Sequence, residues 1–523
     1  MDTARSVGKT GIFQKKNTWR IIFGILLLLL TILVVSPAFQ NDTYYIIKLG
    51  EQVLDSGLDR SDHWAWSAQL INTYPHFLLN IIFALLYRAF GFTGVYVFVV
   101  AAGYAFALSL YHMTEKIYDK AVDEKNTSLY PFVGMIVCVI VIITFQWFII
   151  ARPQLLTFLL WLWEAWFIIR FLNTGKKRYG AAIMIIAWLC ALIHATAWYF
   201  TFVLFIPFMA AVYITRFVKF LSSREINVDR FLQGERFILS GEAECKNVKK
   251  LWIVLPLSYA TGLLTPTRLC YTSIIKASSG NTVIYITEHK PLVLYDLKWV
   301  LAGVLLFMVL FIFFRVKCRL DLLFLFGGTF LMALSSNRHV ALFVFLGWSA
   351  LYYVLFGALK YIPLNFRESI QKTVIPYLAV LALAVLGLAN NNLHDFSYYN
   401  PAFVSDEAID FLKENYDVQE LRLYNDYTYG AYMLFRDMPV FIDSRVNEYT
   451  KEFDPSLERD VFNDYMSVMK LKNNWQDVIA YYDFDGFYIQ KGKELENALS
   501  VDPDYEPVWE NDWMIIFMKA DNT

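Results

Sequence analysis

Eleven apolar runs within residues 1–389 constrain the fold more than any other feature of this sequence. A helix that crosses the hydrocarbon core of a bilayer needs about 20 predominantly apolar residues. The composition also indicates a membrane protein, because 57% of the residues are hydrophobic, whereas soluble domains have about 45–50%. One run, 251–264, is short and depends on its flanks. The predicted spans lie near residues 21–38, 94–112, 131–150, 155–171, 181–198, 199–215, 251–264, 299–314, 321–336, 340–358 and 373–389.

Two apolar segments need a separate interpretation. The run 21–38 lacks a small-residue cleavage site and is followed by ten more spans, so we interpret it as an uncleaved anchor and not a signal peptide. The segment 75–92 is apolar but short, and Arg88 interrupts it. We therefore predict an interfacial or re-entrant helix there.

The loops between the spans carry unequal positive charge. With the N-terminus inside, the predicted cytoplasmic segments hold 105 residues with 26 Lys and Arg, and the outer segments hold 106 residues with 9. Cytoplasmic loops are enriched in Lys and Arg. A span at 75–92 would place "TGKKRYG" and "RVKCR" outside, against this rule. The sequence thus predicts eleven spans, an inner N-terminus and an outer C-terminus. The predicted outer segments before residue 390 are 39–95, 150–154, 194–198, 265–298 and 336–340.

Residues 390–523 form a distinct, acidic region with 27 Asp and Glu against 11 Lys and Arg. About 130 residues are long enough to enclose a core. The segment "SDEAIDFLKENY" predicts a helix, and "QELRLYN", "PVFIDS", "DGFYIQ" and "WMIIFMK" predict short strands. We expect a compact α/β domain on the outer face of the membrane.

The five cysteines show neither a CxxC pair nor a His/Cys metal spacing, and residues 390–523 contain none. No disulfide framework is implied, which favours a bacterial plasma membrane over a secretory-pathway lumen. We expect the bilayer to be a partner and nucleic acid not to be one.

Polar residues gather on the predicted outer side. Asp42 follows the first span, Arg152 ends the third, and Glu288 and Arg338 lie in later outer loops. One interpretation is a single cavity at the outer leaflet, between the helices and the acidic region. The other is a set of unrelated interfacial residues. Six of the seven histidines also lie on this side: His63, His76, His194, His289, His339 and His394.

Three of these positions suggest specific chemistry. Asp42, in "FQNDTYY", is a candidate base for an acceptor hydroxyl or amide, and it equally suits the start of a helix at Thr43. Arg152, in "IIARPQLL", has almost no loop around it, so its guanidinium either binds a ligand phosphate or extends to lipid phosphates. Arg338 and His339, in "SNRHV", repeat the pattern and favour a phosphate ligand.

Two ionisable residues lie within predicted spans. His194, in "ALIHATAW", has the sequence context of a packing histidine more than of a catalyst. Glu164 lies deep in the fourth span, where ionisable residues are costly and often functional. Arg170 is an alternative explanation, as a partner that would relieve the buried charge.

The acidic region contains the dense polar segment "LYNDYTYGAYMLFRDMPVFIDSRVNEY". Tyrosines and carboxylates at strand ends suit sugar or peptide recognition. Asp426, Tyr427, Asp443 and Arg445 are therefore candidate acceptor contacts. The alternative is that "NDYTYG" is only a turn.

These residues occur in an order that resembles the GT-C superfamily of membrane glycosyltransferases, in particular the catalytic subunit of oligosaccharyltransferase. "TEHKP", from Thr287 to Pro291, is similar to that family's Ser/Thr-x-x-Glu motif, often continued as Glu-His-Gln-Pro, in a long outer loop. "YNDYTYG", from Tyr424 to Gly430, is similar to its Trp-Trp-Asp-Tyr-Gly motif, with two residues inserted and no tryptophans. "PVFIDSRVNEY" resembles the segment that follows. The resemblance covers essentially the whole chain.

The resemblance implies a GT-C-like transmembrane domain at 1–389, with outer loops at 39–93 and 265–298, and an extracytoplasmic α/β domain at 390–523. It implies transfer of a sugar or oligosaccharide from a polyprenyl phosphate or pyrophosphate to a lipid, glycan or protein acceptor, with inversion at the anomeric carbon. Asp42 would be the acceptor base and Glu288 its orienting carboxylate. The implied phosphate-binding residues are Arg152, Arg338, His339 and His289.

Two departures from the family pattern narrow this interpretation. The family's second outer loop carries an acidic pair that binds a divalent metal, but this chain has Arg152 and Gln154 there. The oxygen ligand set for Mg²⁺ or Mn²⁺ is incomplete, so a metal is optional, with Asp42 and Glu288 as its remaining candidates. The missing tryptophans point away from Asn-glycosylation and towards relatives that use polyprenyl-phosphate sugars.

Two other functions stay open on the sequence. One is a transporter or flippase for a lipid-linked glycan, although such proteins often carry internal repeats and we find none in the sequence. The other is a non-catalytic envelope-assembly protein on a GT-C frame.

Overall fold

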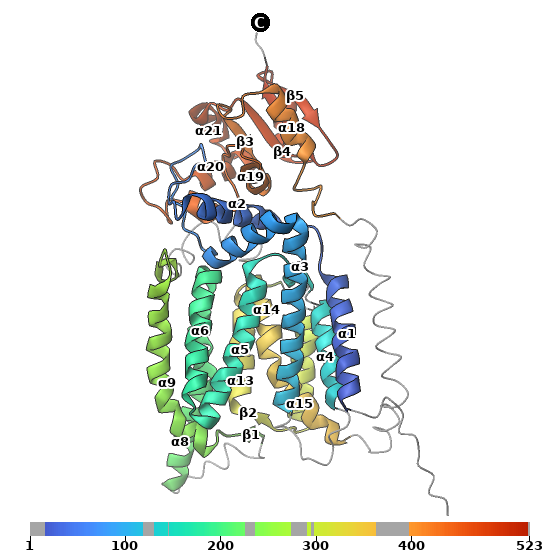
Figure 1. Ribbon diagram of the computed structural model, residues 1–523, viewed down its shortest axis with the longest axis vertical. Coiled ribbons are helices and arrows are strands. Elements are labelled where there is room, and N and C mark those ends of the chain that lie inside the picture. Colours follow the sequence, from blue (N-terminus) through green and yellow to red (C-terminus); the bar gives the residue numbers. More distant parts are fainter. Residues whose placement is uncertain are drawn as a thin grey trace, which may run out of the picture.

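The computed structural model describes residues 16–118, 130–144, 146–224, 236–272, 290–293, 298–361 and 397–520. Figure 1 shows a bundle of helices running roughly side by side, two helical segments lying across its upper end, and a mixed α/β region above them. The bundle positions the loops that matter for function, because each helix delivers its end to one of two opposite faces.

The bundle helices form from runs of Leu, Ile, Val and Phe, since a helix satisfies its own backbone N–H and C=O groups where no water is present. The helices are α1 (Lys16–Val34), α3 (Phe77–Tyr118), α4 (Tyr130–Thr144), α5 (Pro153–Thr174), α6 (Lys177–Ile193), α7 (Phe200–Val203), α8 (Phe205–Ser223), α9 (Glu242–Ala260), α12 (Lys298–Met308), α13 (Leu320–Ser335), α14 (Val340–Leu342) and α15 (Ser349–Ala358).

Four helical segments of the described chain are long and apolar enough to cross a membrane: Phe77–Thr114, Pro153–Thr174, Ala195–Ser223 and Asn337–Ala358. Shorter apolar helices occupy Phe23–Val34, Gly134–Ile143, Val300–Phe313 and Leu320–Ser335. The chain is thus helical, with membrane-spanning helices, and the number of eleven crossings stays a prediction. The last predicted span, 373–389, lies outside the described residues.

The segment 75–92 forms the first part of α3. At Gly91 the backbone leaves the helical conformation, with φ 60° and ψ −155°, a combination that is open essentially to glycine alone. Figure 1 shows the part before this turn lying across the upper end of the bundle beside α2 (Asn41–Ser56), and the part after it running down the bundle. The segment therefore does not follow the bundle axis.

Contacts between loops define the lower end of the bundle. Strand β1 (Phe237–Ile238) pairs in parallel with β2 (Cys318–Arg319). Arg319, the second residue of β2, approaches Glu244 at the start of α9, with 3.4 Å between nitrogen and oxygen. Loops that the charge count assigns to one side of the membrane therefore meet at one end of the bundle.

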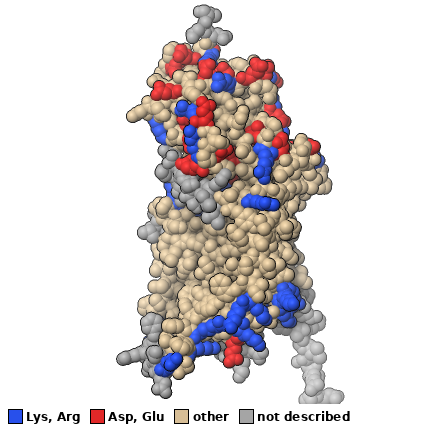
Figure 2. Space-filling view, turned by 90° about the vertical axis from the view of Figure 1, so that its left-hand side faces the viewer, with Lys and Arg blue, Asp and Glu red and all other residues tan. Residues whose placement is uncertain are grey.

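Charge is distributed unevenly along the molecule. Figure 2 shows Lys and Arg gathered at the lower end of the bundle, an uncharged belt around its middle, and most of the visible Asp and Glu on the upper region. An uncharged belt of this extent suits contact with lipid chains and not with water.

Residues 397–520 fold around a four-stranded mixed sheet with strand order β3-β4-β6-β5. β3 pairs in parallel with β4, and β4 and β5 pair antiparallel with β6. β4 and β6 are buried along most of their length, because helices cover the sheet. The strands are β3 (Leu423–Asn425), β4 (Gly486–Gln490), β5 (Tyr505–Glu510) and β6 (Met514–Lys519), and the helices are α18 (Asp406–Asn415), α19 (Tyr427–Phe435), α20 (Val461–Met469), α21 (Trp475–Tyr482) and α22 (Glu494–Ser500).

Local structure in this region follows the predictions in part. α18 forms where expected, with the Ser405 hydroxyl accepting a hydrogen bond from the Ala408 amide (3.1 Å) as an N-cap. "NDYTYG" is not only a turn, because it continues into α19. The predicted strand "PVFIDS" is wrong, since within it only Val440 forms a bridge, to Ala65. β5 was not expected from the sequence.

α2 joins the bundle to the C-terminal region. It packs on α3 on one side and on α19 on the other. Gly50 permits the first contact, since a Cβ there would lie 2.0 Å from the Asn80 carbonyl oxygen. On the second side the buried Tyr44 ring meets the rings of Tyr432 and Phe435, at 5.0 and 5.6 Å between centroids.

Candidate active site at the upper end of the bundle

A cavity of about 480 Å³ opens at the upper end of the bundle. Its size falls within the range of about 300–1,000 Å³ that is typical of ligand pockets. It is lined by the start of α5, by the 3₁₀ turns η3 (Gln146–Phe148) and η4 (Ala195–Ala197), and by η8 (Asn337–His339). The ends of several helices thus enclose one space.

Arg152 lies at the wall of this cavity as the N-cap of α5. Its backbone is extended, with φ −130° and ψ 155°, because the following Pro153 disfavours a helical conformation for the residue before it. Its Nη2 lies 3.0 Å from Asp42 Oδ2, and the two side chains are 18% and 23% exposed. The pair is therefore partly shielded from solvent but still reachable.

Asp42 belongs to the first turn of α2, and Gln40 is the N-cap. A carboxylate in this turn interacts favourably with the helix dipole. The Thr43 hydroxyl donates to the Ala151 carbonyl (3.1 Å), which fixes the start of α2 against the segment that carries Arg152. Residues 42 and 152 are thus held together by two contacts.

Arg338 and His339 reach the same cavity from η8. Because a carbonyl oxygen only accepts, His339 Nδ1 carries the hydrogen in its 3.1 Å contact with the Met332 carbonyl. The Phe200 ring packs edge-on at 5.1 Å from the imidazole. Two arginines from different helices, Arg152 and Arg338, therefore line one space together with a fixed imidazole.

Of the other predicted outer histidines, two are buried together near the cavity and one is exposed away from it. His194 is buried in the cavity wall, where its Nδ1 donates to the Thr157 hydroxyl (3.0 Å), because that hydroxyl itself donates to the Pro153 carbonyl. His76 packs against His194 at 5.3 Å between rings. His63 is exposed and pairs with Asp59 away from the cavity. A packing role for His194 agrees with these contacts.

The predicted residues Glu288 and His289 lie outside the described residues, as does His394. The chain resumes at Lys290, whose carbonyl accepts a hydrogen bond from the Asn337 amide (3.0 Å). Asn337 itself lines the cavity.

Part of the cavity wall was not predicted from the sequence. Gln154, Thr157 and Trp161 line it from one face of α5, and their spacing of three and then four residues is the signal that was available. The Gln154 Oε1 and Trp161 Nε1 atoms are buried and have no hydrogen-bond partner among the described residues. A polar ligand or water would satisfy them.

The proposed pairing of Glu164 with Arg170 is wrong. Arg170 lies over the Trp166 ring at 5.5 Å and donates to the Tyr179 hydroxyl (3.4 Å). Six residues on a helix place two side chains on different faces, since only spacings of three or four bring them together.

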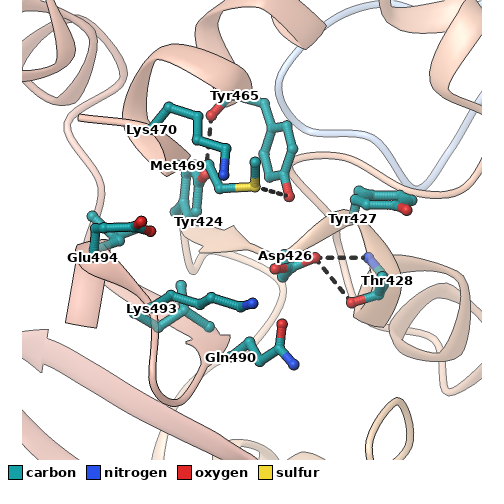
Figure 3. A pocket seen from close by; sticks show the side chains of 12 residues that line it. Tyr424, Asp426, Tyr427, Thr428, Tyr465, Met469, Lys470, Gln490, Lys493 and Glu494 are labelled. Carbon is teal, nitrogen blue, oxygen red and sulfur yellow. Dashed lines mark hydrogen bonds between the residues drawn. The ribbon is translucent and has the colours of Figure 1, made fainter. Parts of the chain in front are cut away.

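Asp426 and Tyr427 line a second, separate cavity of about 240 Å³ in the C-terminal region. Figure 3 shows Asp426 beside the start of α19, where its carboxylate accepts from the Thr428 amide (3.1 Å) and hydroxyl (2.9 Å). Burial raises the pKa of Asp426, and the two hydrogen bonds from Thr428 act in the opposite direction.

Asp443 and Arg445 are buried in a network that joins the C-terminal region to the first loop. Arg445 is 3% exposed, and its Nη2 lies 2.6 Å from Asp443 Oδ2. Its Nη1 donates to Asn72 Oδ1 (2.7 Å) and pairs with Asp62. Protein groups on both regions thus satisfy these two side chains and join the regions, while direct acceptor contact by Asp443 and Arg445 stays a prediction.

Glu448 completes this network. Its carboxylate accepts from the Thr73 hydroxyl and lies 3.6 Å from Arg445 Nη1. Burial raises the pKa of Glu448 to about 7, against the lowering effect of the nearby arginine.

The described residues do not complete a metal site. Among them, no three His, Cys, Asp or Glu side chains lie close enough to hold an ion. Asp42 is engaged by a guanidinium, and a hard cation requires several oxygen ligands. The donor set in the described part of the cavity therefore fits phosphate better than Mg²⁺ or Mn²⁺.

No family model and no curated protein matches the sequence. Solved structures do match. The oligosaccharyltransferase of Archaeoglobus fulgidus, tethered to an acceptor peptide with an NVT sequon, has a TM-score of 0.57 at 11% identity, over 97% of this chain and 74% of its own. ArnT from Cupriavidus metallidurans, bound to undecaprenyl phosphate, has a TM-score of 0.52 at 10% identity, over 97% of this chain and 99% of its own. Both are GT-C glycosyltransferases, and what this chain shares with them is the fold.

Proposed function

We propose that this chain, which has the fold of the GT-C glycosyltransferases, transfers a sugar from a polyprenyl phosphate or pyrophosphate donor to an acceptor. The observation that carries the proposal is the cavity that Arg152 and Arg338 line together, with the Asp42 carboxylate held at Arg152. Two guanidinium groups suit a phosphate, and a carboxylate beside them suits deprotonation of a nucleophile.

The similar structures support a lipid-linked donor. ArnT, which is similar over nearly its whole length, was solved with undecaprenyl phosphate bound. The oligosaccharyltransferase was solved with an acceptor peptide. A lipid phosphate entering from the bilayer would reach the upper cavity at the ends of the bundle helices.

Orientation in the membrane is part of the proposal. The lower end of the bundle gathers Lys and Arg (Figure 2), as cytoplasmic faces do. The cavity and the C-terminal region at the upper end then face outward, and the protein would reside in a bacterial plasma membrane. The acceptor would be a lipid, glycan or protein on the outer surface.

In the proposed reaction, an acceptor hydroxyl or amide attacks the anomeric carbon of the donor from the face opposite its phosphate oxygen. The bond from the anomeric carbon to that oxygen breaks, and the configuration inverts. Asp42 takes the proton of the nucleophile. Arg152, Arg338, His339 and His289 receive the departing phosphate, which is a good leaving group and requires no strong general acid.

Glu288 retains its proposed role as the carboxylate that orients Asp42 or the acceptor. The support for it is that Lys290, two residues further on, accepts a hydrogen bond from the cavity-lining Asn337. The proposed reaction contains no metal-dependent step, because the described donors fit phosphate better than a hard cation.

The decisive experiment replaces Asp42 by Asn. We expect sugar transfer to fall by about 100-fold or more, the contribution typical of a general base, while polyprenyl-phosphate binding is retained. Asp55→Asn is the matched control, because Asp55 lies on the same helix but forms an exposed pair with Arg88. Transfer is measured with membranes and a radiolabelled lipid-linked sugar.

Full transfer by the Asp42→Asn variant would show that Asp42 is not the base. If no lipid-linked sugar supports transfer by the unmodified protein, but a labelled lipid crosses the bilayer, the flippase alternative is correct. If neither occurs, the non-catalytic alternative holds.

A further inference from the structure

The second cavity lies in the C-terminal region, apart from the one between the bundle helices. It forms where the parallel strands β3 and β4 end and where α19 and α22 begin. The carboxyl ends of parallel strands are the usual location of ligand sites in open α/β sheets. At about 240 Å³ it is smaller than pockets for drug-sized ligands, which measure about 300–1,000 Å³. One ring-sized unit therefore fits.

Three tyrosines line it, and among them the Tyr427 ring is the partly exposed one. Tyr424 and Tyr465 are each 1% exposed and stack on each other behind it, with 5.7 Å between centroids and 15° between planes. The Tyr427 ring meets Tyr465 edge-on at 6.1 Å, and Figure 3 shows it near Asp426 and Thr428. Rigid aromatic surfaces with polar edges recognise ligands that are partly apolar and partly hydroxylated.

Charged and amide side chains supply the polar part. Figure 3 shows Lys493 extending towards Asp426 and Gln490, with Lys470 and Glu494 on the other sides of the space. Within the described chain, neither Lys470 nor Lys493 forms an ion pair. Donors and acceptors thus alternate around the rings.

A peptide is a poorer fit than a sugar. Peptides commonly bind an α/β region by adding a strand to an open sheet edge, but the edge next to this cavity is occupied. The Asn425 side chain accepts from the Phe441 amide (2.8 Å) and donates to the Ile442 carbonyl (2.7 Å).

We propose that this cavity binds one sugar unit of a glycan acceptor, with the Tyr427 ring against its apolar face and with Lys493, Gln490 and Asp426 on its hydroxyl groups. The inference rests on the proposed function in treating the bound sugar as part of the acceptor. It assigns a substrate class, since the acceptor then carries a glycan and is not a bare peptide.

The test measures sugar binding to the full-length protein in lipid nanodiscs, without donor, by saturation-transfer difference NMR. The probes are glucose, galactose, N-acetylglucosamine and glucuronic acid, with glycerol as a non-binding reference and the peptide Gly-Ser-Thr-Gly as a competitor class. At least one sugar is expected to give a signal above glycerol. Lys493→Ala should weaken its binding about 10-fold or more, the loss expected for a hydrogen bond to a charged group.

Lys491→Ala is the matched control, because Lys491 lies two residues away but pairs with Glu510 at the surface. Unchanged binding in this control is expected. Lys470→Ala provides a second exposed position in the cavity in case Lys493 alone contributes little. The inference is overturned if no sugar exceeds glycerol, if the peptide binds and the sugars do not, or if both cavity variants bind like the control.

The sugar-binding and sugar-transfer measurements together distinguish failure of the proposed sugar site from failure of the proposed transfer reaction. Loss of transfer in Asp42→Asn with intact sugar binding supports both. Sugar binding in a protein that transfers no sugar from any lipid-linked donor contradicts the proposed function alone. If the protein binds no sugar and the cavity variants transfer sugar normally, the proposed sugar site alone is contradicted.

Discussion

Although 109 residues lie between them along the chain, Asp42 and Arg152 form an ion pair. A guanidinium presents five N–H donors in a fixed fork, and Arg152 directs its Nη2 to the Asp42 carboxylate. In the proposed reaction, this pairing would place the base, and with it the nucleophile, close to the cation that receives the leaving phosphate.

Glu448 gives a prediction about pH. Its folded-state pKa of about 7 is above its ordinary value of 4.5. The stabilisation that it provides is therefore complete below pH 4.5 and is lost as the pH rises through about 7. The full change is about 3 kcal/mol in the free energy of unfolding. In Glu448→Gln this component of the pH dependence should disappear.

The measurement is thermal unfolding in nanodiscs at pH 5 and pH 8. The variant should lose less stability than the unmodified protein between the two values. Glu452→Gln, at a neighbouring exposed position, should behave like the unmodified protein. The same pH slope in all three proteins would contradict the burial effect at Glu448.

Single residues were predictable where a polar side chain stands out against an apolar run. Arg152, Arg338 and His339 were found in this way and line the cavity. Trp161 was not, because an indole inside a span has the same pattern as packing. The partnership of Asp62 with Arg445 was also beyond the sequence, since nothing local links positions so far apart.

At the scale of helices, α3 depends on its turn at Gly91. An alanine Cβ is strained at φ 60° and ψ −155°, at a cost of about 1–3 kcal/mol. Gly91→Ala should therefore lower the thermal midpoint and also disturb α2, which packs on the first part of α3. Differential scanning fluorimetry measures the first effect, and sugar transfer measures the second.

Gly328→Ala is the control, because this glycine lies inside α13 with open space where a Cβ would be. There alanine should be neutral or stabilising by up to about 1 kcal/mol, since it favours the helical conformation. Equal destabilisation by both substitutions would show that the backbone at Gly91 is not the cause.

Elements were predictable to the extent that one local signal decided them. Long apolar runs gave the bundle helices. The segment "PVFIDS" has the pattern of a strand, but the Asn425 side chain occupies the backbone groups of Phe441 and Ile442, so no strand can pair there. β5 was not predicted, because Pro507 and two glutamates interrupt the apolar residues that would indicate a strand. Such residues are accepted in β5 because it lies at the edge of the sheet.

At the scale of the whole molecule, the buried Arg445 network decides how the C-terminal region is docked. Arg445→Ala would leave Asp443 and Asp62 buried without their cation, which costs about 3–5 kcal/mol when one partner of a buried pair is removed. We expect faster hydrogen exchange and easier proteolysis in loop 57–76 and residues 440–450.

Lys519→Ala removes an exposed pair with Asp483 and should change stability by less than about 1 kcal/mol. If loop 57–76 exchanges as slowly in Arg445→Ala as in this control, the network does not hold the two regions together.

The helical, membrane-spanning character of the chain was predictable because apolar runs recur along most of its length, whereas the number of eleven crossings stays a prediction. The grouping of loops at two opposite ends agrees with the count of Lys and Arg, although which end faces the cytoplasm stays part of the proposal. The docking of the C-terminal region on α2 was not predictable. Contacts such as that of Tyr44 with Tyr432 involve aromatic residues that look like ordinary core positions in either segment alone.

Helix α2 is tightly packed on two sides. One of its flanks touches the backbone of α3 at Gly50, the other lies against α19, and its first turn bears Asp42. A displacement of α19 would therefore shift the first turn of α2 and change the 3.0 Å separation of the Asp42 and Arg152 side chains.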